Sequence, residues 1–133
     1  MGQRQKDATN ANTDLPVLQR GKQVEKPWGY ELWFAHNDKY VGKLIFVKQG
    51  SRLSLQYHEK KDETLLVIRG LAKFTIGDTD VIVAAGDGSV RVRPNCHHRI
   101  EAITDVTIVE VSTPEITDVV RIEDDFGRVG RVV

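Results

Sequence analysis

Short strand-like segments separated by turn residues constrain the fold of this chain more than any other feature. Gly, Asp or Asn interrupts these segments about every eight to twelve residues, which is typical of a β-sandwich or barrel. No window of the sequence has a convincing helical period. The segments are rich in Val, Ile, Thr and aromatic residues and read GYELWF, KYVGKLIFVK, TLLVIRG, AKFTIG, DVIVAAG, SVRVR, HRIEAI and VTIVEV. We therefore predict an all-β fold.

Several boundaries follow from turn chemistry. The segment IGDTDVI predicts a tight hairpin with Gly77 and Asp78 at its turn. Pro114 cannot donate a ladder hydrogen bond and is expected to close the preceding strand. Further on, DVVRI predicts one more strand before a final loop.

The chain is long enough for one domain and one core. Residues 1–22 are polar, and they have too few large apolar side chains to offset their ordering entropy, so we predict a flexible N-terminal tail. Residues 23–133 are predicted to form a single domain.

Charge and composition exclude several classes of partner. Nineteen basic residues balance nineteen acidic ones, which gives no global signature of binding to nucleic acid or to an anionic membrane. No apolar run approaches the ~20 residues of a membrane helix, and the N-terminus lacks the apolar segment of a secretory signal. Cys96 is the single cysteine, so no intrachain disulfide can form, and a cytoplasmic location is expected.

A group of polar side chains falls on or beside strand-like segments between residues 50 and 70. Alternation along a strand places Gln56 and His58 on one face. Glu63 opens the next segment after a short charged link, so a hairpin can return it against His58. His98 begins another strand-like run. Two imidazoles, a carboxylate and an amide oxygen are a plausible set of metal ligands.

The same stretch resembles the first conserved motif of the cupins, G-x5-H-x-H-x4-E-x6-G. Gly50, His58, Glu63 and Gly70 match that motif without a gap, and Gln56 replaces its first histidine. The resemblance implies a double-stranded β-helix, the jelly-roll barrel of the cupins.

The second cupin motif is matched less well, in VRPNCHHRIEA. Alignment there places His98 on the metal-binding histidine, Arg93 on the family proline, Asn95 on its glycine and Ala102 on its asparagine. Successive residues of an extended segment face opposite ways, so one of the two adjacent histidines is expected to reach the metal. His98 aligns best, and His97 would take its place if the loop were bulged.

Three further segments narrow the resemblance to the cupin domain of type II mannose-6-phosphate isomerases. They read EKPWGYELW, RLSLQYH and RIEDDFGR, and the similarity extends from Lys26 to Arg128. The related type I isomerases carry zinc on a Gln-x-His pair, a Glu and a His. The resemblance thus implies one divalent metal, zinc first and Mn, Fe or Ni as alternatives, held by Gln56, His58, Glu63 and His98.

The chain departs from the isomerase pattern just after His58. Family members usually read close to H-x-x-R-x-E-H-W, whereas here Lys61 replaces the arginine, Thr64 the second histidine and Leu65 the tryptophan. These replacements weaken the expectation of isomerase activity more than the expectation of metal binding.

Other residues are candidates for substrate contacts. Arg52 and Ser54 share the predicted ligand face, where arginine suits bidentate binding of an anion, although Arg52 could also lie in water near the barrel mouth. Arg128 belongs to the family's characteristic tail and could fold back over the pocket. Lys43 is the one candidate for a catalytic acid or base, although a surface lysine is the simpler expectation.

The leading hypothesis is a metal-dependent isomerase of a phosphorylated or acidic sugar. A non-catalytic sugar- or metabolite-binding module is an alternative, favoured by the residues missing after His58. An Fe(II) cupin oxygenase is a third, because two histidines and a carboxylate can form a facial triad. Cupins commonly pair, so a homodimer is also expected.

Overall fold

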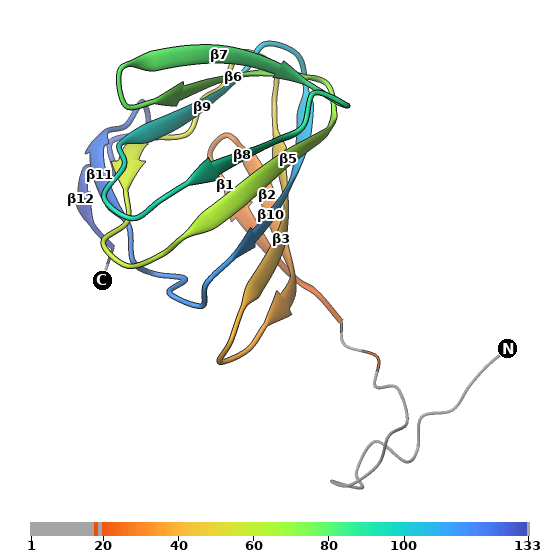
Figure 1. The fold of residues 1–133 in the computed structure, drawn as a ribbon, viewed down its shortest axis with the longest axis vertical. Coiled ribbons are helices and arrows are strands. Elements are labelled where there is room, and N and C mark those ends of the chain that lie inside the picture. The colour runs from red at the N-terminus through yellow and green to blue at the C-terminus, as the bar shows by residue number, and fades with distance from the viewer. Residues whose placement is uncertain (1–17, 19, 133) are drawn as a thin grey trace, which may run out of the picture.

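Two antiparallel sheets form the whole fold. The computed structural model describes residue 18 and residues 20–132, and within these it contains twelve strands and no helix (Figure 1). One sheet has the order β1(Lys22–Lys26), β2(Gly29–His36), β3(Val41–Val47), β10(Val106–Ser112), β5(Glu63–Arg69), β8(Ser89–Val92). The other has the order β12(Gly130–Arg131), β11(Val120–Glu123), β4(Leu55–Tyr57), β9(His98–Ala102), β6(Leu71–Ile76), β7(Thr79–Ala84). The prediction of an all-β jelly-roll barrel is confirmed.

Several predicted boundaries are also confirmed. β6 and β7 form the expected hairpin, in which Ile76 pairs with Thr79 and Gly77 has a φ of 59°. The segment DVVRI overlaps β11, which begins at Val120 and ends one residue later at Glu123, and Pro114 lies just beyond the end of β10 at Ser112.

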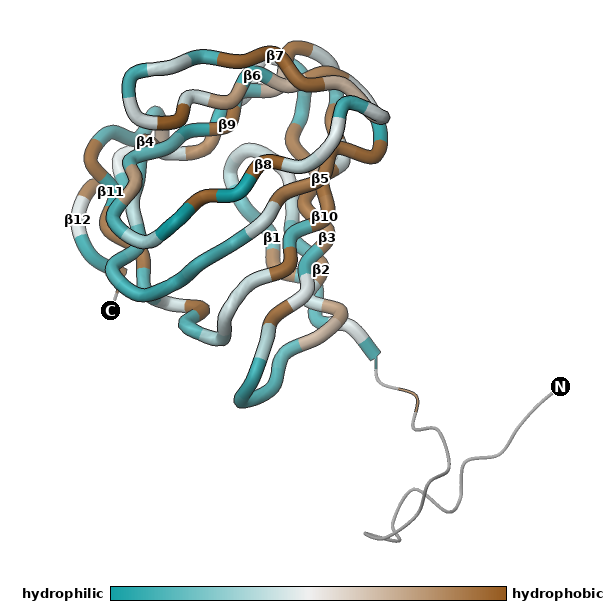
Figure 2. The backbone as a smooth tube through the Cα atoms, in the orientation of Figure 1, coloured by the Kyte–Doolittle hydropathy of each residue, from teal (hydrophilic) through white to brown (hydrophobic). Residues whose placement is uncertain are grey.

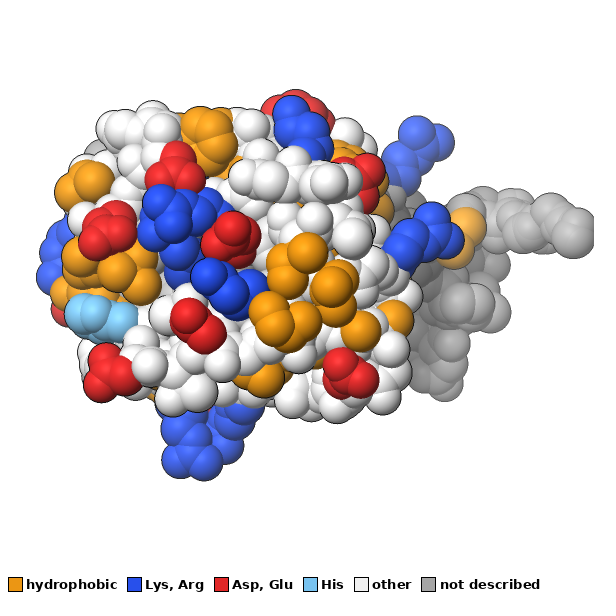
Figure 3. Space-filling model, turned by 90° about the horizontal axis from the view of Figure 1, so that it is seen from above, with side chains coloured by type: hydrophobic (Ala, Val, Ile, Leu, Met, Phe, Trp, Pro, Cys, Tyr) orange, Lys and Arg blue, Asp and Glu red, His pale blue; other side chains and the backbone are white. Residues whose placement is uncertain are grey.

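The core lies between the two sheets. Buried and more exposed residues alternate along strands such as β5 and β10, as period-2 alternation requires. Figure 2 shows hydrophobic residues recurring along the strands of both sheets. The buried apolar side chains include Ile45, Val47, Leu65, Val67, Phe74, Val92, Ile100, Val106 and Ile108. Seen from above, the outer surface carries interspersed acidic and basic side chains rather than a field of one sign (Figure 3).

Two backbone positions explain residues of the cupin motifs. Gly70 has a φ of 89°, and a Cβ there would collide with the carbonyl oxygen of Asp105, so only glycine fits. Asn95 stands where the family has glycine and has a φ of 66°. Asparagine tolerates this left-handed conformation better than most residues, which accounts for the replacement.

The predicted flexible tail over residues 1–22 falls largely on residues 1–17 and 19, which lie outside the described residues. β1 begins at Lys22, the last residue of that range. Among the residues that the structure describes, no helix is long and apolar enough to cross a membrane.

Candidate metal centre

A cavity of about 240 Å³ opens between the two sheets. Its volume is just below that of typical ligand pockets, which begin at about 300 Å³, so it suits a small molecule. Ionisable side chains form much of its wall: Lys26, Glu31, Lys43, His58, Lys61, Glu63, His98, Arg99, Glu110, Arg121 and Arg128. This lining is unusual for a barrel interior, because buried charges are costly unless they are paired or bind a ligand.

Two histidines and a glutamate converge in this cavity. His58, Glu63 and His98 expose only 1%, 4% and 3% of their surface. Glu63 Oε2 lies 2.7 Å from His58 Nε2 and 3.4 Å from His98 Nε2. The candidate ligand atoms all lie within 4.8 Å of one another, so one metal ion could contact all three residues.

The backbone fixes which nitrogen of each imidazole faces the cluster. His58 Nδ1 lies 2.6 Å from the carbonyl oxygen of Asp118, and His98 Nδ1 lies 2.9 Å from that of Cys96. A carbonyl oxygen only accepts, so each Nδ1 donates and, in the neutral ring, each Nε2 keeps a lone pair. Metal-binding histidines are typically oriented in this way.

Two atoms of the cluster have no hydrogen-bond partner. His58 Nε2 and Glu63 Oε2 are buried and unsatisfied, although they lie close together. A lone pair and a carboxylate oxygen at this distance repel unless a cation, either a proton or a metal ion, lies between them. The residues present therefore fit a divalent metal.

Glu63 is held in its ionised form. Burial would raise the pKa of its carboxyl, but the charge of Lys61 and the proximity of His58 and His98 outweigh burial and keep that pKa well below its ordinary value. An ionised carboxylate is the form that binds a metal.

Lys61 and Glu110 form a buried ion pair beside the cluster. Lys61 Nζ lies 2.9 Å from Glu110 Oε2 and 3.9 Å from Glu63 Oε1. Burial raises the pKa of Glu110, and Glu63 adds to this rise, while the charge of Lys61 opposes it without cancelling it. Lys61, which replaces the family arginine, thus keeps a cation at that position.

Gln56 lies next to His98 across the sheet. The two residues are paired in register between β4 and β9, and both line the cavity. Gln56 Oε1 accepts a hydrogen bond of 2.6 Å from the hydroxyl of Ser54, which is itself buried. A carbonyl oxygen has a second lone pair, and Gln56 as a metal ligand stays a prediction.

The structure separates the two adjacent histidines. His98 joins the cluster, whereas His97 is exposed and stacks on Tyr57 with ring centroids 4.9 Å apart. The loop is not bulged in the way that would exchange them.

Lys43 is not the surface residue that was the simpler expectation. It is buried in the cavity wall, with Nζ 3.2 Å from Glu31 Oε1 and 5.3 Å from the ring centroid of Trp33. The expectation is wrong because inward alternation on β3 places Lys43 beside a carboxylate that the sequence pattern did not pair with it. Its catalytic role stays a prediction.

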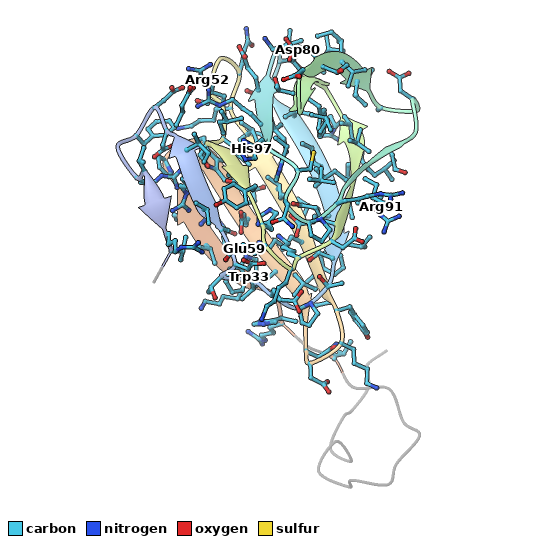
Figure 4. All side chains as sticks on the ribbon, turned by 60° about the vertical axis from the view of Figure 1, so that its left-hand side comes forward. Trp33, Arg52, Glu59, Asp80, Arg91 and His97 are labelled. Carbon is cyan, nitrogen blue, oxygen red and sulfur yellow. The ribbon has the colours of Figure 1, made fainter. Side chains whose placement is uncertain are left out.

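Arg52 and Arg128 differ in their placement. Arg52 does not line the cavity; its guanidinium binds Asp125 through two hydrogen bonds of 2.7 and 2.9 Å. Figure 4 shows Arg52 and the cavity residue Trp33 at opposite ends of the barrel. Arg128 does line the cavity and is paired with Asp124. The contacts of Arg52 and Arg128 with a substrate both stay predictions.

Sequence reasoning missed several charged residues of the wall. Lys26 and Arg121 lie in the segments EKPWGYELW and RIEDDFGR, which carried the family resemblance, yet neither was singled out. Glu31 and Glu110 were missed because single charged residues within apolar strands resemble solvated positions. Alternation alone does not reveal which face of a strand is lined by a polar cavity.

Comparison with known proteins identifies the family of this chain. A sequence profile described as "Mannose-6-phosphate isomerase C-terminal" matches residues 14–126. The chain belongs to this family. Mannose-1-phosphate guanylyltransferase of Escherichia coli K12 is 34% identical over 113 residues, which cover 81% of this chain and 23% of that protein. The xanthan biosynthesis protein XanB of Xanthomonas campestris (strain B100) is 30% identical over 112 residues, 80% of this chain and 24% of that protein.

The chain thus spans about a quarter of the length of these curated relatives. Solved structures support the cupin fold alone, since their identities are low. KdgF from Halomonas sp. has a TM-score of 0.66 at 17% identity, covering 75% of this chain and 90% of that one. The nucleoside dehydratase Pac13 has a TM-score of 0.68 at 14% identity, covering 81% of this chain and 89% of that one. A mutant of Bacillus subtilis oxalate decarboxylase OxdC has a TM-score of 0.68 at 18% identity, covering 77% of this chain and 30% of that one.

Proposed function

We propose that this protein is a metal-dependent enzyme that acts on a phosphorylated or acidic sugar, most simply as an aldose–ketose isomerase of the mannose-6-phosphate isomerase kind. The observation that carries the proposal is the cluster of His58, Glu63 and His98, whose unsatisfied atoms face a cavity lined by cations. Family membership supports the same chemistry.

His58, Glu63 and His98 would hold the metal, with Gln56 as a fourth ligand and zinc as the first choice. A bound divalent metal would supply Lewis-acid polarisation of a sugar carbonyl oxygen. The residues around it serve to fix the ligands, since the carbonyls of Asp118 and Cys96 orient the two imidazoles.

Isomerisation also requires a group that moves a proton between adjacent carbons. Lys43 and Glu110 both line the cavity, and each is paired with an opposite charge, Glu31 and Lys61 respectively. We choose Glu110, because burial raises its pKa toward the working range of a general base. Glu63 is committed to the cluster.

The first test is the metal content and turnover of untagged protein, beside His58→Ala. We expect about one equivalent of a transition metal and conversion of mannose 6-phosphate to its ketose by NMR, with both lost in His58→Ala. The matched control is His97→Ala, which removes an exposed imidazole outside the cluster and should change neither.

Other results would select among the alternatives. Metal with tight sugar binding but no product over hours would favour the binding module, to which the replacements at Lys61, Thr64 and Leu65 already point. Oxygen uptake by iron-loaded protein would favour an oxygenase. A folded protein that refuses zinc, manganese and iron would contradict both enzyme hypotheses.

A further inference from the structure

Lys26 and Arg121 are cations of the cavity wall that have no carboxylate partner. Both side chains line the cavity, and both residues are half-buried. Within residues 20–132, neither forms an ion pair. Lys26 ends β1 and Arg121 lies on β11, so opposite sheets bring the two charges to one cavity.

The other cations of the cavity wall are all neutralised. Their partners are Glu31 for Lys43, Glu110 for Lys61, Glu123 for Arg99 and Asp124 for Arg128. Lys26 and Arg121 therefore differ from the other cations of the cavity wall, because their positive charges are available to a ligand.

The two unpaired positive charges repel each other, which makes the charged form of each less stable. Burial and the positive charges of Lys43, Arg121 and Arg128 lower the pKa of Lys26, although Glu31 opposes them. Like charges in a partly buried cavity repel more strongly than they do in water. An anion placed between Lys26 and Arg121 would remove this repulsion and gain charge-assisted hydrogen bonds.

The strand register fixes how far Arg121 lies from the metal cluster. Arg121 pairs with Gln56, and Gln56 pairs with His98, so the three form one row across β11, β4 and β9. Opposed residues of neighbouring strands lie roughly 5 Å apart, which separates Arg121 from His98 by roughly 10 Å at the backbone. A monosaccharide can bridge the two ends of such a row.

We propose that Lys26 and Arg121 form an anion subsite that binds the phosphate or carboxylate group of a sugar, while the sugar's carbonyl end lies at His58, Glu63 and His98. The subsite deepens the proposed function and rests on it for the identity of the substrate. The two cations together favour a phosphate dianion over a carboxylate monoanion.

The test measures anion binding without turnover. Inorganic phosphate and acetate are titrated by calorimetry at low salt into the protein as purified. Fluorescence provides a local readout, because both tryptophans of the chain, Trp28 and Trp33, line the cavity. Lys26→Gln and Arg121→Gln should each weaken phosphate binding at least tenfold.

Control variants separate charge from folding. Arg121→Lys keeps the charge and should retain most of the affinity, while Arg91→Gln alters an exposed arginine paired with Asp62 and should leave it unchanged. Tighter binding of phosphate than acetate assigns the subsite to phosphate esters, and the reverse order assigns it to sugar acids. No anion binding by the wild type, or equal binding by Lys26→Gln and Arg121→Gln, overturns the subsite. Phosphate binding without isomerase turnover would retain the subsite and reject the proposed function.

Discussion

Two backbone carbonyls determine how the buried histidines of this cavity can be used. Because the carbonyls of Asp118 and Cys96 accept from Nδ1 of His58 and His98, the Nε2 atoms turn to Glu63. The cluster is therefore arranged by the backbone as well as by its own side chains. The three side chains are therefore preorganised, because they can bind a ligand without rearranging.

Glu110 provides the sharpest test at the level of a single residue. Glu110→Gln should lower isomerase turnover by roughly 10²–10⁴-fold, because it removes the proposed base, while the metal content stays unchanged. The pKa of Glu110 is raised by burial above its ordinary 4.5, and a base works only when ionised. Wild-type turnover should therefore rise with pH through a value above 4.5, and the residual activity of the variant should lack this limb.

The matched control for this experiment is Glu101→Gln, which makes the same change in a half-exposed carboxylate paired with Lys73. Its turnover and pH profile should match those of the wild type. Equal turnover in Glu110→Gln and wild type would return the role of base to Lys43.

The candidate ligands were predictable from sequence, and their surroundings were not. A fixed motif spacing identified His58 and Glu63. The predicted hairpin that would return Glu63 against His58 is wrong, because β4 and β5 lie in opposite sheets and Glu63 reaches His58 across the barrel interior. The pairing of Lys61 with Glu110 joins the end of a loop to a distant strand. No local pattern encodes such a contact, since it depends on the register between β5 and β10.

At the level of elements, Asp118 ties the loop before β11 to the loop that follows β4. Its carboxylate accepts hydrogen bonds from the backbone N–H groups of residues 59–61, and its carbonyl accepts from His58. Asp118→Ala should lower the free energy of unfolding by roughly 1–3 kcal/mol and weaken metal binding. Urea denaturation and metal titration measure the two effects, and Asp38→Ala in an exposed loop is the control. Unchanged metal affinity in Asp118→Ala would show that the loop is held by other contacts.

The segment between β11 and β12 should respond to acid. Hydrogen bonds from the Arg128 side chain, with smaller backbone contributions, lower the pKa of Asp124 from 3.8 to about 2. A depressed folded-state pKa stabilises the fold above about pH 4, and this contribution is lost as the pH falls toward 2. Between pH 4 and pH 2 the urea midpoint of the wild type should fall more steeply than that of Asp124→Asn. Arg128→Gln should flatten the slope in the same way, and parallel slopes in all three proteins would contradict the assignment.

Element boundaries were predictable where turn chemistry is strong, as at Gly77 in the β6–β7 hairpin. They were less so before β4. Strand alternation from residue 52 to 56 placed Arg52 on the ligand face, but only an isolated bridge to Glu101 forms there. Leu53 and Ser54 both line the cavity, because this stretch is not a regular strand.

At the scale of the whole molecule, the outer face of the first sheet is unexpectedly apolar. An antiparallel sheet with one buried face usually presents polar residues on the other. Here the strand register places apolar residues beside one another on the outside, in the rows Phe34–Gly42–Val111 and Leu32–Leu44–Val109–Leu66. Among the side chains on this face, Phe34 is 46% exposed, Leu66 40%, Ile68 46% and Val111 54%. Contiguous exposed apolar surface of this kind usually marks an interface.

We therefore predict that two copies of the chain pair through this sheet face, which assigns the expected homodimer to a specific surface. Light scattering at micromolar concentration should give twice the 15.0 kDa mass of one chain. Val111→Glu combined with Leu66→Glu should yield monomers, because burying unpaired carboxylates at the centre of an interface is costly. Ile82→Glu changes an exposed apolar residue of β7, on the other sheet, and should leave the mass unchanged. A monomeric wild type would mean that this face has another partner or none, whereas a dimer that survives the double substitution would place the contact on a different surface.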